Sequence, residues 1–595
     1  MKFLKTFLAS ILGTLTALFL LFIVLLIMVM SSSSEPEPYV RANTVLKMEI
    51  TGDIPERAVR SPLDELFNPA SGDPVSLRSL KRNLEKAAAH DNIEGVWVTT
   101  NFVTSSWANL ETARSYFQEY KESGKFLYFS TDDMGYNSKA YFLATAADSI
   151  FSPPETSFQF EGFTAQFSFY RDMLEKIGVE PEIARVGAYK SAVEPFMNRE
   201  SSPESREQTL EILNSATNLY VSAVAERLGV SSDEVNRLMN TPPIGRVEFA
   251  FEQGLLDVQA YPDEVEEHIK KRIELDEDTD LRTISFGRYS RVTGKSAGLD
   301  EASTSDKIAV IYTSGAIMPQ LDDFPFGDSD GITASNVKKQ LDAALDDDDV
   351  KAIVLHVNSG GGAATTSDVI WHYVRKAAES KPVVASMGNV AASGGYYIAA
   401  GADTIVANPN TITGSIGIFA LLFNFQELME ENIGIRTETL KTHEFADLYD
   451  LSTRLTPQER RVFQQMMDRG YESFVSRMAE SRGMSFDELQ ELAQGRVYTG
   501  THAYEVGLVD VLGNLDRAIA IAAEMAGIEE YKLESFPKQR DFFQTLMSSG
   551  NAQLKAMMQS WIPSPIRHDM TTLQQIMRHP AGQQWAIMPY EIRIE

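Results

Sequence analysis

Segments in the first half of this 595-residue chain recur in the second half at a nearly constant distance, and this repetition constrains the fold more than any other feature. "YFLATAADSI", which begins at Tyr141, resembles "YYIAAGADTI", which begins at Tyr396, without gaps at an offset of 255 residues. "DNIEGVWVTT" resembles "DDVKAIVLHV", and "GRVEFAFEQGLLD" resembles "GRVYTGTHAYEVGLVD" with three residues inserted. Three matches in the same order predict a duplicated domain.

Each repeat has the pattern of an α/β domain. "GVWVTT" and "AIVLHV" are short apolar runs rich in β-branched residues, which predicts buried strands. "TSDVIWHYVRKAAES" has helical periodicity and leads into the apolar run "KPVVASMG", so helices and strands alternate. Long amphipathic helices are expected in "SREQTLEILNSATNLYVSAVAERLG" and "TPQERRVFQQMMDRGYESFVSRMAESRG", each ending at a glycine. We expect two tandem α/β domains, residues 39–300 and 301–540, followed by a C-terminal tail at 541–595.

Residues 1–38 predict a cytoplasmic N-terminus, one transmembrane helix and a linker. The 25 residues from Thr6 to Met30 carry no charge, and as a helix they would be about 37 Å long, against about 30 Å for the hydrocarbon core of a bilayer. Two lysines precede this run and two glutamates follow it, which favours an N-terminus inside the cell. The bulk of the chain would then face the periplasm of a bacterium, anchored in the inner membrane. A cleaved signal peptide is the alternative, because "SSSS" follows the run.

Composition removes several classes of function. The net charge of −29 argues against a nucleic-acid partner, which would need a basic face. The chain has no cysteine, so disulfides, thiolate metal sites and cysteine nucleophiles are all absent. It also lacks an HExxH zinc motif, a P-loop and a cofactor fingerprint in its proper context. We therefore expect no cofactor and no metal.

The two repeats differ where residues could carry chemistry. After its strand, the second repeat reads "NSGGGAATTSDVI", with glycines from Gly360 to Gly362, whereas the first repeat has "NFVTSSWANLETA". The unobstructed amides of such a loop suit an oxyanion or a phosphate. Ser415, in "TGSIGIFA", aligns with Phe160 of the first repeat, which therefore has no hydroxyl there. Lys190, in "RVGAYKSAVEPF", is a lysine in a mostly apolar segment of the first repeat.

A serine and a lysine are chemically sufficient for hydrolysis. A serine hydroxyl needs a base to attack an amide at neutral pH. An ordinary lysine, with a pKa of about 10.4, is protonated, but burial can lower that pKa by up to about 3–5 units. A dyad of Ser415 and Lys190 would then need no histidine and no metal.

Other interpretations of these residues stay open. Ser415 is also explained as a turn serine, the glycines as a tight strand-to-helix turn, and Lys190 as a surface lysine. Ser393, in "NVAASGGYYIAA", is the rival nucleophile, although Ala-Ser-Gly-Gly also permits close helix packing. His356 and His443 are alternative bases, and each is also explained as an ordinary core or surface histidine.

Four segments together resemble the signal peptide peptidase A family, in the long, duplicated form known as protease IV. They are "NSGGGAATTSDVI", "ASMGNVAASGGYYIAAGADTIVANPNTITGSIGIF", "GRVYTGTHAYEVGLVDVLG" and "VGAYKSAVEPF", and the resemblance runs from about residue 45 to residue 535, plus the anchor. It implies a Clp/crotonase-like fold in each repeat, Ser415 as the nucleophile and Lys190 as the general base. It also implies a membrane-anchored homotetramer whose active sites form where the two halves of one chain meet.

The resemblance further implies that the chain degrades remnant signal peptides and other apolar peptides. Backbone amides of Gly361 and Gly362 would then stabilise the oxyanion. The family usually has Ser-Pro-Gly-Gly where this chain has a third glycine at Gly360, and the related Clp protease subunit carries its serine near Ser393. The alternative functions are a non-hydrolytic membrane scaffold and an acyl-CoA enzyme of the crotonase type.

Overall fold

The computed structural model describes most of the chain between residues 37 and 538. The described residues are 13, 14, 16, 17, 20, 37–58, 74–241, 246–276, 278–300, 302–319, 331–538 and 585–587. The predicted membrane span, Thr6 to Met30, therefore lies almost entirely outside them. Within the described ranges, no helix is both long enough and apolar enough to cross a bilayer.

The chain divides into two compact units that do not coincide with the sequence repeats. Unit 1 comprises Met1–Ser105, Ala113–Gln159 and Gly245–Glu301, and unit 2 comprises Ser106–Thr112, Phe160–Ile244 and Ala302–Glu595. The segment that carries Lys190 thus belongs to the first repeat by sequence and to unit 2 by packing. The domain boundaries at residues 300 and 540 remain predictions.

Unit 1 is built on a parallel sheet, confirming the α/β expectation for the first repeat. In its described part, six strands follow the order β6-β4-β3-β2-β1-β7, and all their pairings are parallel. "GVWVTT" lies in β2, as predicted. Its elements are β1 (Thr44–Gly52), α3 (Leu77–Ala89), β2 (Ile93–Val103), α4 (Trp107–Lys121, which belongs to unit 2 up to Thr112), β3 (Phe126–Ser130), α5 (Ser138–Ala144), β4 (Ser149–Ser152), α10 (Val247–Glu252), β6 (Val258–Gln259), α11 (Pro262–Arg272), β7 (Arg282–Ser285), α12 (Phe286–Tyr289) and η3 (Lys295–Ala297).

Unit 2 has a larger sheet, parallel except where β15 pairs antiparallel with β13, and a second, smaller sheet. The large sheet has the order β15-β13-β11-β9-β8-β17, with β12 pairing β11 and β16 pairing β12. The core elements of unit 2 are β8 (Lys307–Ser314), α13 (Ala334–Leu345), β9 (Val350–Ser359), α14 (Ala364–Ala378), β11 (Val383–Ala392), α15 (Gly394–Ala399), β12 (Thr404–Ala407), β13 (Ile412–Gly414), β15 (Val497–Thr499), α18 (Gly500–Glu505), β16 (Val511–Leu512), α19 (Leu515–Ala526) and β17 (Lys532–Phe536). Its remaining elements are α6 (Arg171–Ile177), β5 (Glu180–Arg185), η2 (Ser191–Val193), α7 (Glu194–Met197), α8 (Pro203–Leu228), α9 (Ser232–Met239), β10 (Gly361–Ala363), β14 (Phe419–Asn424), the π-helix η4 (Leu428–Ile433), α16 (Pro457–Arg482), α17 (Phe486–Leu492) and β18 (Trp585–Ile587).

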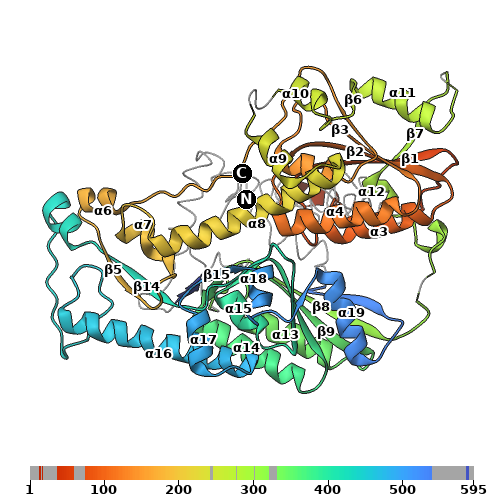
Figure 1. The fold of residues 1–595 in the computed structure, drawn as a ribbon. Helices are drawn as coiled ribbons and strands as arrows, with labels where there is room; N and C mark the ends of the chain where they lie inside the picture. The colour runs from red at the N-terminus through yellow and green to blue at the C-terminus, as the bar shows by residue number, and fades with distance from the viewer. Residues whose placement is uncertain are drawn as a thin grey trace, which may run out of the picture. The chain divides into compact units, whose positions relative to one another are not determined.

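Helices cover both faces of the large sheet, which explains the unbroken apolar run in β9. Successive side chains of a strand point to opposite faces. Ile353 and Leu355 therefore enter the cluster that includes α13 and α14, whereas Ala352 and Val354 pack against α19 (Figure 1). A strand buried on both faces carries apolar residues at every position, as parallel sheets do.

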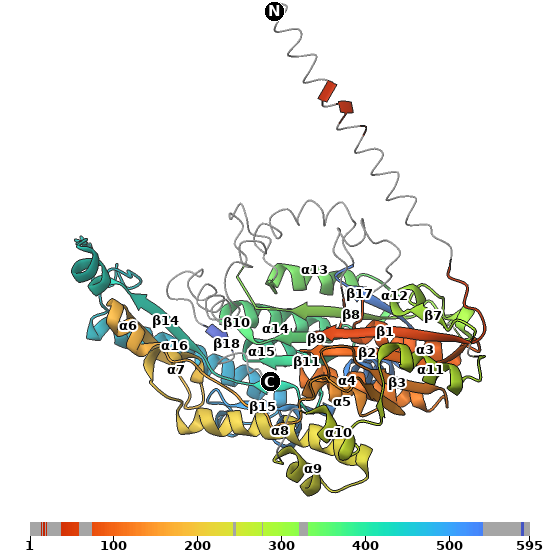
Figure 2. The same ribbon diagram turned by 90° about the horizontal axis from the view of Figure 1, so that it is seen from above.

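The small sheet of unit 2 supplies the chain that leads to Lys190. Its order is β10-β18-β14-β5, and its pairings are antiparallel. β5 pairs with β14 along its whole length, from Glu180 opposite Asn424 to Arg185 opposite Phe419 (Figure 2). Lys190 follows β5 by five residues, and Phe419 follows Ser415 by four, so this pairing draws the lysine segment toward the serine segment.

The two predicted long helices begin and end where the sequence indicates. α8 is capped by Ser202 and α16 by Thr456, each hydroxyl accepting from a backbone amide of the first turn. Gly229 and Gly483 end them in the left-handed conformation that glycine adopts without a steric penalty. Both predictions are confirmed, and α8 becomes important for the site described next.

Candidate active site

Lys190 is completely buried and lies against two serines. It stands at the start of η2, after β5, with no exposed surface. Its Nζ lies 2.8 Å from Ser393 Oγ, 3.0 Å from Ser415 Oγ and 3.0 Å from Ser415 O. The structure thus brings together the predicted lysine, the predicted serine and the rival serine. All three residues belong to unit 2.

Burial changes the acid–base behaviour of this lysine. Loss of hydration holds the pKa of the Lys190 amine well below its ordinary value, because the ammonium is disfavoured more than the neutral form. A neutral amine has two N–H donors and one lone pair. Ser415 O can only accept, so it takes one N–H. Of the two hydroxyls, one can then accept the second N–H while the other donates its proton to the lone pair.

Two glycines make room for the lysine side chain. Gly495 has φ +79°, and a Cβ there would lie 2.6 Å from Lys190 Cβ. A Cβ at Gly417 would lie 2.9 Å from Gly495 Cα and 3.4 Å from Lys190 Cδ. Gly417, the second glycine of "TGSIG", and Gly495, the first glycine of "GRVYTG", therefore line the slot that holds Lys190. Sequence reasoning used the "GRV" segment to detect the repeats and "TGSIG" to single out Ser415, and it missed this role of their glycines.

Ser393 occupies a strained turn between a strand and a helix. It follows β11, caps α15 and has φ +55° and ψ −114°, a conformation that a non-glycine residue rarely adopts. Its amide donates to Gly414 O over 2.7 Å. A Cβ at Gly395 would clash with Ser359 O, so only glycine lets this turn pack against the end of β9.

Ser415 also adopts a positive φ, of +51°, in a different turn. It follows β13, and its amide donates to Arg496 O over 2.6 Å. The residue is fully buried. Both serines are therefore buried, and a backbone hydrogen bond fixes each of them.

The two predicted oxyanion glycines have different surroundings. The amide of Gly361 donates to Ser359 Oγ over 3.1 Å, so it already has a partner in this structure. Gly362 lies in β10 opposite Ala586 of β18, and a Cβ at Gly362 would clash with Ile317 O. Because Gly362 has no side chain, the backbone of this loop can lie close to the backbone of Ile317.

The order of strands decides which serine lies beside the glycine loop. β11 lies between β13 and β9, with Ala392 opposite Gly414 on one side and Ala391 opposite Ser359 on the other. Ser393, directly after β11, is therefore adjacent to the glycine loop that follows β9. Ser415, directly after β13, is two strands away from that loop, which corresponds to about 10 Å.

The alternative bases lie elsewhere. His356 is buried in β9, where its Nδ1 lies 3.3 Å from Ser386 Oγ. His443 is exposed, with its Nδ1 3.0 Å from Thr442 Oγ1. Among the described residues, neither ring hydrogen-bonds to either candidate serine, and no group of three or more His, Asp or Glu side chains is placed to hold a metal ion.

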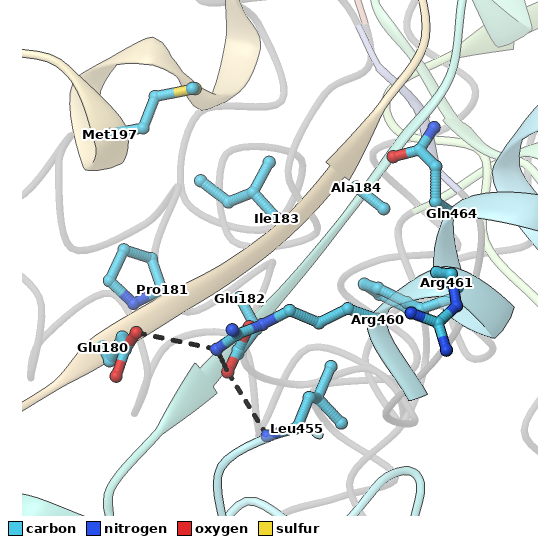
Figure 3. Close-up of a pocket in the computed structure, with 11 residues that line it drawn as sticks. Glu180, Pro181, Glu182, Ile183, Ala184, Met197, Leu455, Arg460, Arg461 and Gln464 are labelled. Atoms are coloured by element: carbon cyan, nitrogen blue, oxygen red, sulfur yellow. Dashed lines mark hydrogen bonds and ion pairs between the residues drawn. The ribbon is translucent and has the colours of Figure 1, made fainter. Parts of the chain in front are cut away.

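An ion pair fixes β5 upstream of Lys190. Arg460 of α16 donates to both carboxylate oxygens of Glu182, over 2.9 and 2.7 Å, and this bonding raises the pKa of Arg460 (Figure 3). Leu455 N donates to Glu182 Oε1 over 3.4 Å. The pair borders a cavity of about 520 Å³ between β5 and α16. None of the candidate catalytic residues lines this cavity.

Comparison with known protein families gives two matches along the chain. The model of peptidase family S49 matches residues 119–276 and again residues 375–529. The first match contains Lys190, and the second contains Ser393 and Ser415. The duplication inferred from the sequence is thus a repeat of one peptidase domain.

Curated relatives match over most of the chain. Serine protease SPPA, chloroplastic, of Arabidopsis thaliana is 34% identical over 83% of this chain and 71% of that protein. Protease 4 of Salmonella typhi is 32% identical over 82% of this chain and 79% of its own length. Protease 4 of Haemophilus influenzae is 29% identical over 81% and 80%. A solved structure of a ClpP1 mutant from Listeria monocytogenes has 15% identity and a TM-score of 0.24, covering 35% of this chain and 94% of that one.

Proposed function

The chain belongs to peptidase family S49 and is a serine peptidase, and from that premise we propose that it cleaves peptide bonds with Lys190 as general base and Ser393 as nucleophile. The observation that carries this proposal is the 2.8 Å contact between the buried Lys190 Nζ and Ser393 Oγ. We further propose a Clp/crotonase-like fold for each repeat, because such a fold is built on a parallel sheet and the strands of each repeat pair in parallel.

Three observations favour Ser393 over Ser415, which the sequence predicts as the nucleophile. Ser393 lies beside the glycine loop, whereas Ser415 is two strands away from it. An attacking oxygen must reach a carbon whose carbonyl oxygen is held by nearby amides, so it belongs next to the loop. Ser393 also forms a strained turn into a helix, the geometry that exposes a nucleophile in other hydrolases. Its contact with the lysine is the shorter of the two hydroxyl contacts.

Ser415 then acts as a positioning residue for the lysine. Its carbonyl and hydroxyl both lie 3.0 Å from Lys190 Nζ. They take up the two N–H bonds of the neutral amine and leave the lone pair aimed at Ser393. This assignment uses all three contacts of the amine and leaves none of its groups unsatisfied in the buried site.

The reaction follows from these roles. Neutral Lys190 takes the proton of Ser393 Oγ as that oxygen attacks the peptide carbonyl carbon and its π electrons move onto oxygen. The amide of Gly394, which follows the nucleophile, and that of Gly362 are the proposed oxyanion donors, each contributing about 10²–10³ in rate. Protonated Lys190 gives its proton to the leaving amine as the C–N bond breaks. The same lysine then activates a water molecule, which hydrolyses the acyl-enzyme.

The substrate is proposed to bind as an extended strand. β18 lies between β10 and β14, with Gly362 opposite Ala586 and Phe419 opposite Trp585. A short segment of chain thus already pairs with the glycine loop and with the strand after "TGSIG". A peptide in the same place would gain main-chain hydrogen bonds on both sides, the usual mode of strand addition.

The physiological setting is proposed from the sequence and its resemblance to the signal peptide peptidase A family. The uncharged run from Thr6 to Met30 supports a single-pass anchor in the inner membrane, with the peptidase facing the periplasm. The proposed substrates are remnant signal peptides and other apolar peptides, and the proposed assembly is a homotetramer. No nucleic acid, metal or cofactor takes part in the proposed reaction.

Covalent labelling tests the nucleophile and the base together. A fluorophosphonate should form an adduct on Ser393 that peptide mass spectrometry locates, at a rate that rises with pH through the pKa of Lys190, because only the neutral amine is a base. Lys190→Ala should lower that rate by about 10³-fold or more. Ser415→Ala should keep the adduct on Ser393 and slow its formation.

Each other outcome has a clear meaning. An adduct on Ser415 would restore the serine predicted from the sequence. Full labelling in the Lys190→Ala variant would refute the role of the lysine. A folded protein with neither adduct nor turnover would favour the non-hydrolytic scaffold.

A further inference from the structure

In space, the four-residue segment Gln494–Val497 lies between the loop that carries Lys190 and the loop that carries Ser415. On the lysine side, Tyr189 N donates to Gln494 O over 3.0 Å. This segment contains the "GRV" motif that recurs in both repeats. It is therefore in direct backbone contact with the residue before the lysine.

The same segment holds the serine loop. Ser415 N donates to Arg496 O over 2.6 Å, and Gly495 N donates to Ile416 O over 2.8 Å. The segment thus has hydrogen bonds to both loops. Any movement between it and the lysine loop would change the distance from the amine to the serines.

One side chain of α8 joins this segment to the lysine loop with both ends of its amide. Gln208 is 1% exposed. Its Nε2 donates to Ser191 Oγ over 2.9 Å and lies 3.4 Å from Tyr189 O, so it reaches both chain neighbours of Lys190. Its Oε1 accepts from Val497 N over 3.1 Å.

We propose that Gln208 is a positioning residue for the general base, because its amide holds the chain on both sides of Lys190 at a set distance from the segment that holds Ser415. The proposal rests on the proposed function, in which Lys190 activates a serine. It assigns to α8, a helix outside both the large sheet and the glycine loop, a direct part in the geometry of the catalytic centre.

The lysine needs such support because no charged partner holds it. Its Nζ contacts two hydroxyls and one carbonyl. The charged groups on the elements around it are Arg185 of β5, which donates to Lys190 O over 3.4 Å, Glu194 of α7, which pairs with Arg185 at 3.7 Å, and Arg496. Among the described residues, none of these three hydrogen-bonds to Nζ. Backbone placement must therefore fix the amine.

The proposal predicts a specific kinetic signature for Gln208→Met, which keeps the side-chain volume and removes both hydrogen-bonding ends. We expect kcat to fall about tenfold, because the three hydrogen bonds that link the lysine loop to the segment Gln494–Val497 are lost, with KM within twofold. A looser lysine loop also admits water to the amine, so the pH midpoint of kcat should move upward. Rates are divided by the concentration of enzyme that the fluorophosphonate titrates, which removes any unfolded fraction.

Two further variants separate positioning from folding. Ser191→Ala removes only the hydroxyl to which Gln208 donates. It should lower kcat by about threefold or less and raise the pH midpoint by less than Gln208→Met does. Asn214→Leu exchanges an amide for an apolar group on the exposed face of the same helix, and should leave both unchanged.

The outcomes distinguish this proposal from the one on which it rests. If Lys190→Ala is inactive while titrated Gln208→Met keeps the kcat and pH midpoint of the unsubstituted enzyme, the positioning role is wrong and the base assignment stands. If Gln208→Met lowers the titrated fraction without moving the pH midpoint, its role is structural only, and the proposal is overturned. If Lys190→Ala retains full activity, the proposed function itself fails.

Discussion

The segment Ser138–Tyr141 in unit 1 and the segment Ser393–Tyr396 in unit 2 occupy equivalent positions in the two repeats, at the offset of 255. Their tyrosines behave alike: Tyr141 OH donates to Leu255 O over 2.9 Å, and Tyr396 OH donates to Leu508 O over 2.8 Å. Their serines do not. Ser138 lies within α5 and donates to Gln159 O over 3.4 Å, whereas Ser393 has φ +55° and lies 2.8 Å from Lys190 Nζ.

The residues between serine and tyrosine account for this difference. Unit 1 has Lys139 and Ala140 there, and unit 2 has Gly394 and Gly395. A Cβ at Gly395 would clash with Ser359 O, so an alanine at this position is incompatible with the turn of unit 2. A serine at this position is therefore not what distinguishes the two repeats. The glycines that allow the turn of unit 2 to approach β9 distinguish them.

Two buried lysines extend the comparison. Lys86 and Lys190 both have no exposed surface. Lys86 Nζ donates to three backbone carbonyls, Tyr289 O, Ser290 O and Val292 O, over 3.0, 3.3 and 2.9 Å. Three acceptors satisfy the three N–H bonds of an ammonium. Lys190 has one carbonyl and two hydroxyls, a set that suits a neutral amine, so the acceptors around the two lysines differ in kind.

The largest expected effect is on kcat, and it should separate Ser393 from Ser138, its counterpart in the first repeat. Ser393→Ala should lower kcat by about 10⁴-fold or more, as loss of a serine nucleophile does in other peptidases. Ser138→Ala should leave kcat within twofold, because that hydroxyl bonds only to a nearby carbonyl in unit 1. Both rates are measured on a fluorogenic apolar peptide. A large loss of kcat in Ser138→Ala would contradict the distinction between Ser138 and Ser393.

Replacing the two buried lysines should change stability in opposite senses at neutral pH. Lys86→Met leaves three buried carbonyls without the ammonium and should cost about 3 kcal/mol or more in the free energy of unfolding. Lys190→Met should raise the thermal midpoint at pH 7. The folded state holds this amine neutral and the unfolded state binds a proton, so folding of the unsubstituted protein is penalised there.

The pH dependence gives the control for this pair. Because the unfolded state binds more protons, the stability of the unsubstituted protein rises with pH from the lowered folded pKa of Lys190 up to the unfolded pKa, about 10.4. The advantage of Lys190→Met should therefore shrink as pH approaches 10. An advantage that stays constant between pH 7 and pH 10 would show that Lys190 is protonated in the folded protein.

The smallest effect concerns the shared scaffold. Tyr141→Phe and Tyr396→Phe each remove one buried hydrogen bond to a carbonyl, and each should cost about 1 kcal/mol in the free energy of unfolding. Both variants should keep kcat within twofold, since neither hydroxyl reaches the lysine or the serines. Denaturant unfolding measures the costs. Unequal costs, differing by about 2 kcal/mol or more, would contradict a common scaffold.

Much of the fold could be predicted because local patterns carry it. The apolar runs became β2 and β9, and the long amphipathic segments became α8 and α16, each ending at its glycine. Side-chain alternation and helix-terminal glycines depend only on neighbouring residues. The repeat was readable for the same reason: a duplicated scaffold keeps the residues that its internal hydrogen bonds require.

The site was predicted in part. Sequence reasoning singled out Lys190, Ser415 and Ser393, and all three meet in unit 2. It did not find Gly417 and Gly495 as the walls of the lysine slot, nor Gln208 as the bridge between the loops. These contacts join residues far apart in the chain, and no spacing within one motif reveals them.

By itself, the sequence determined the repeated α/β scaffold, the candidate lysine and the two candidate serines, because each depends on residue type and local periodicity. Only the tertiary structure decided what those residues can do together. The order β13-β11-β9 places Ser393, rather than Ser415, beside the glycine loop, and complete burial lowers the pKa of the Lys190 amine. Both properties arise from packing between distant segments, since strand order and loss of hydration are set by what surrounds a residue rather than by its neighbours in the chain.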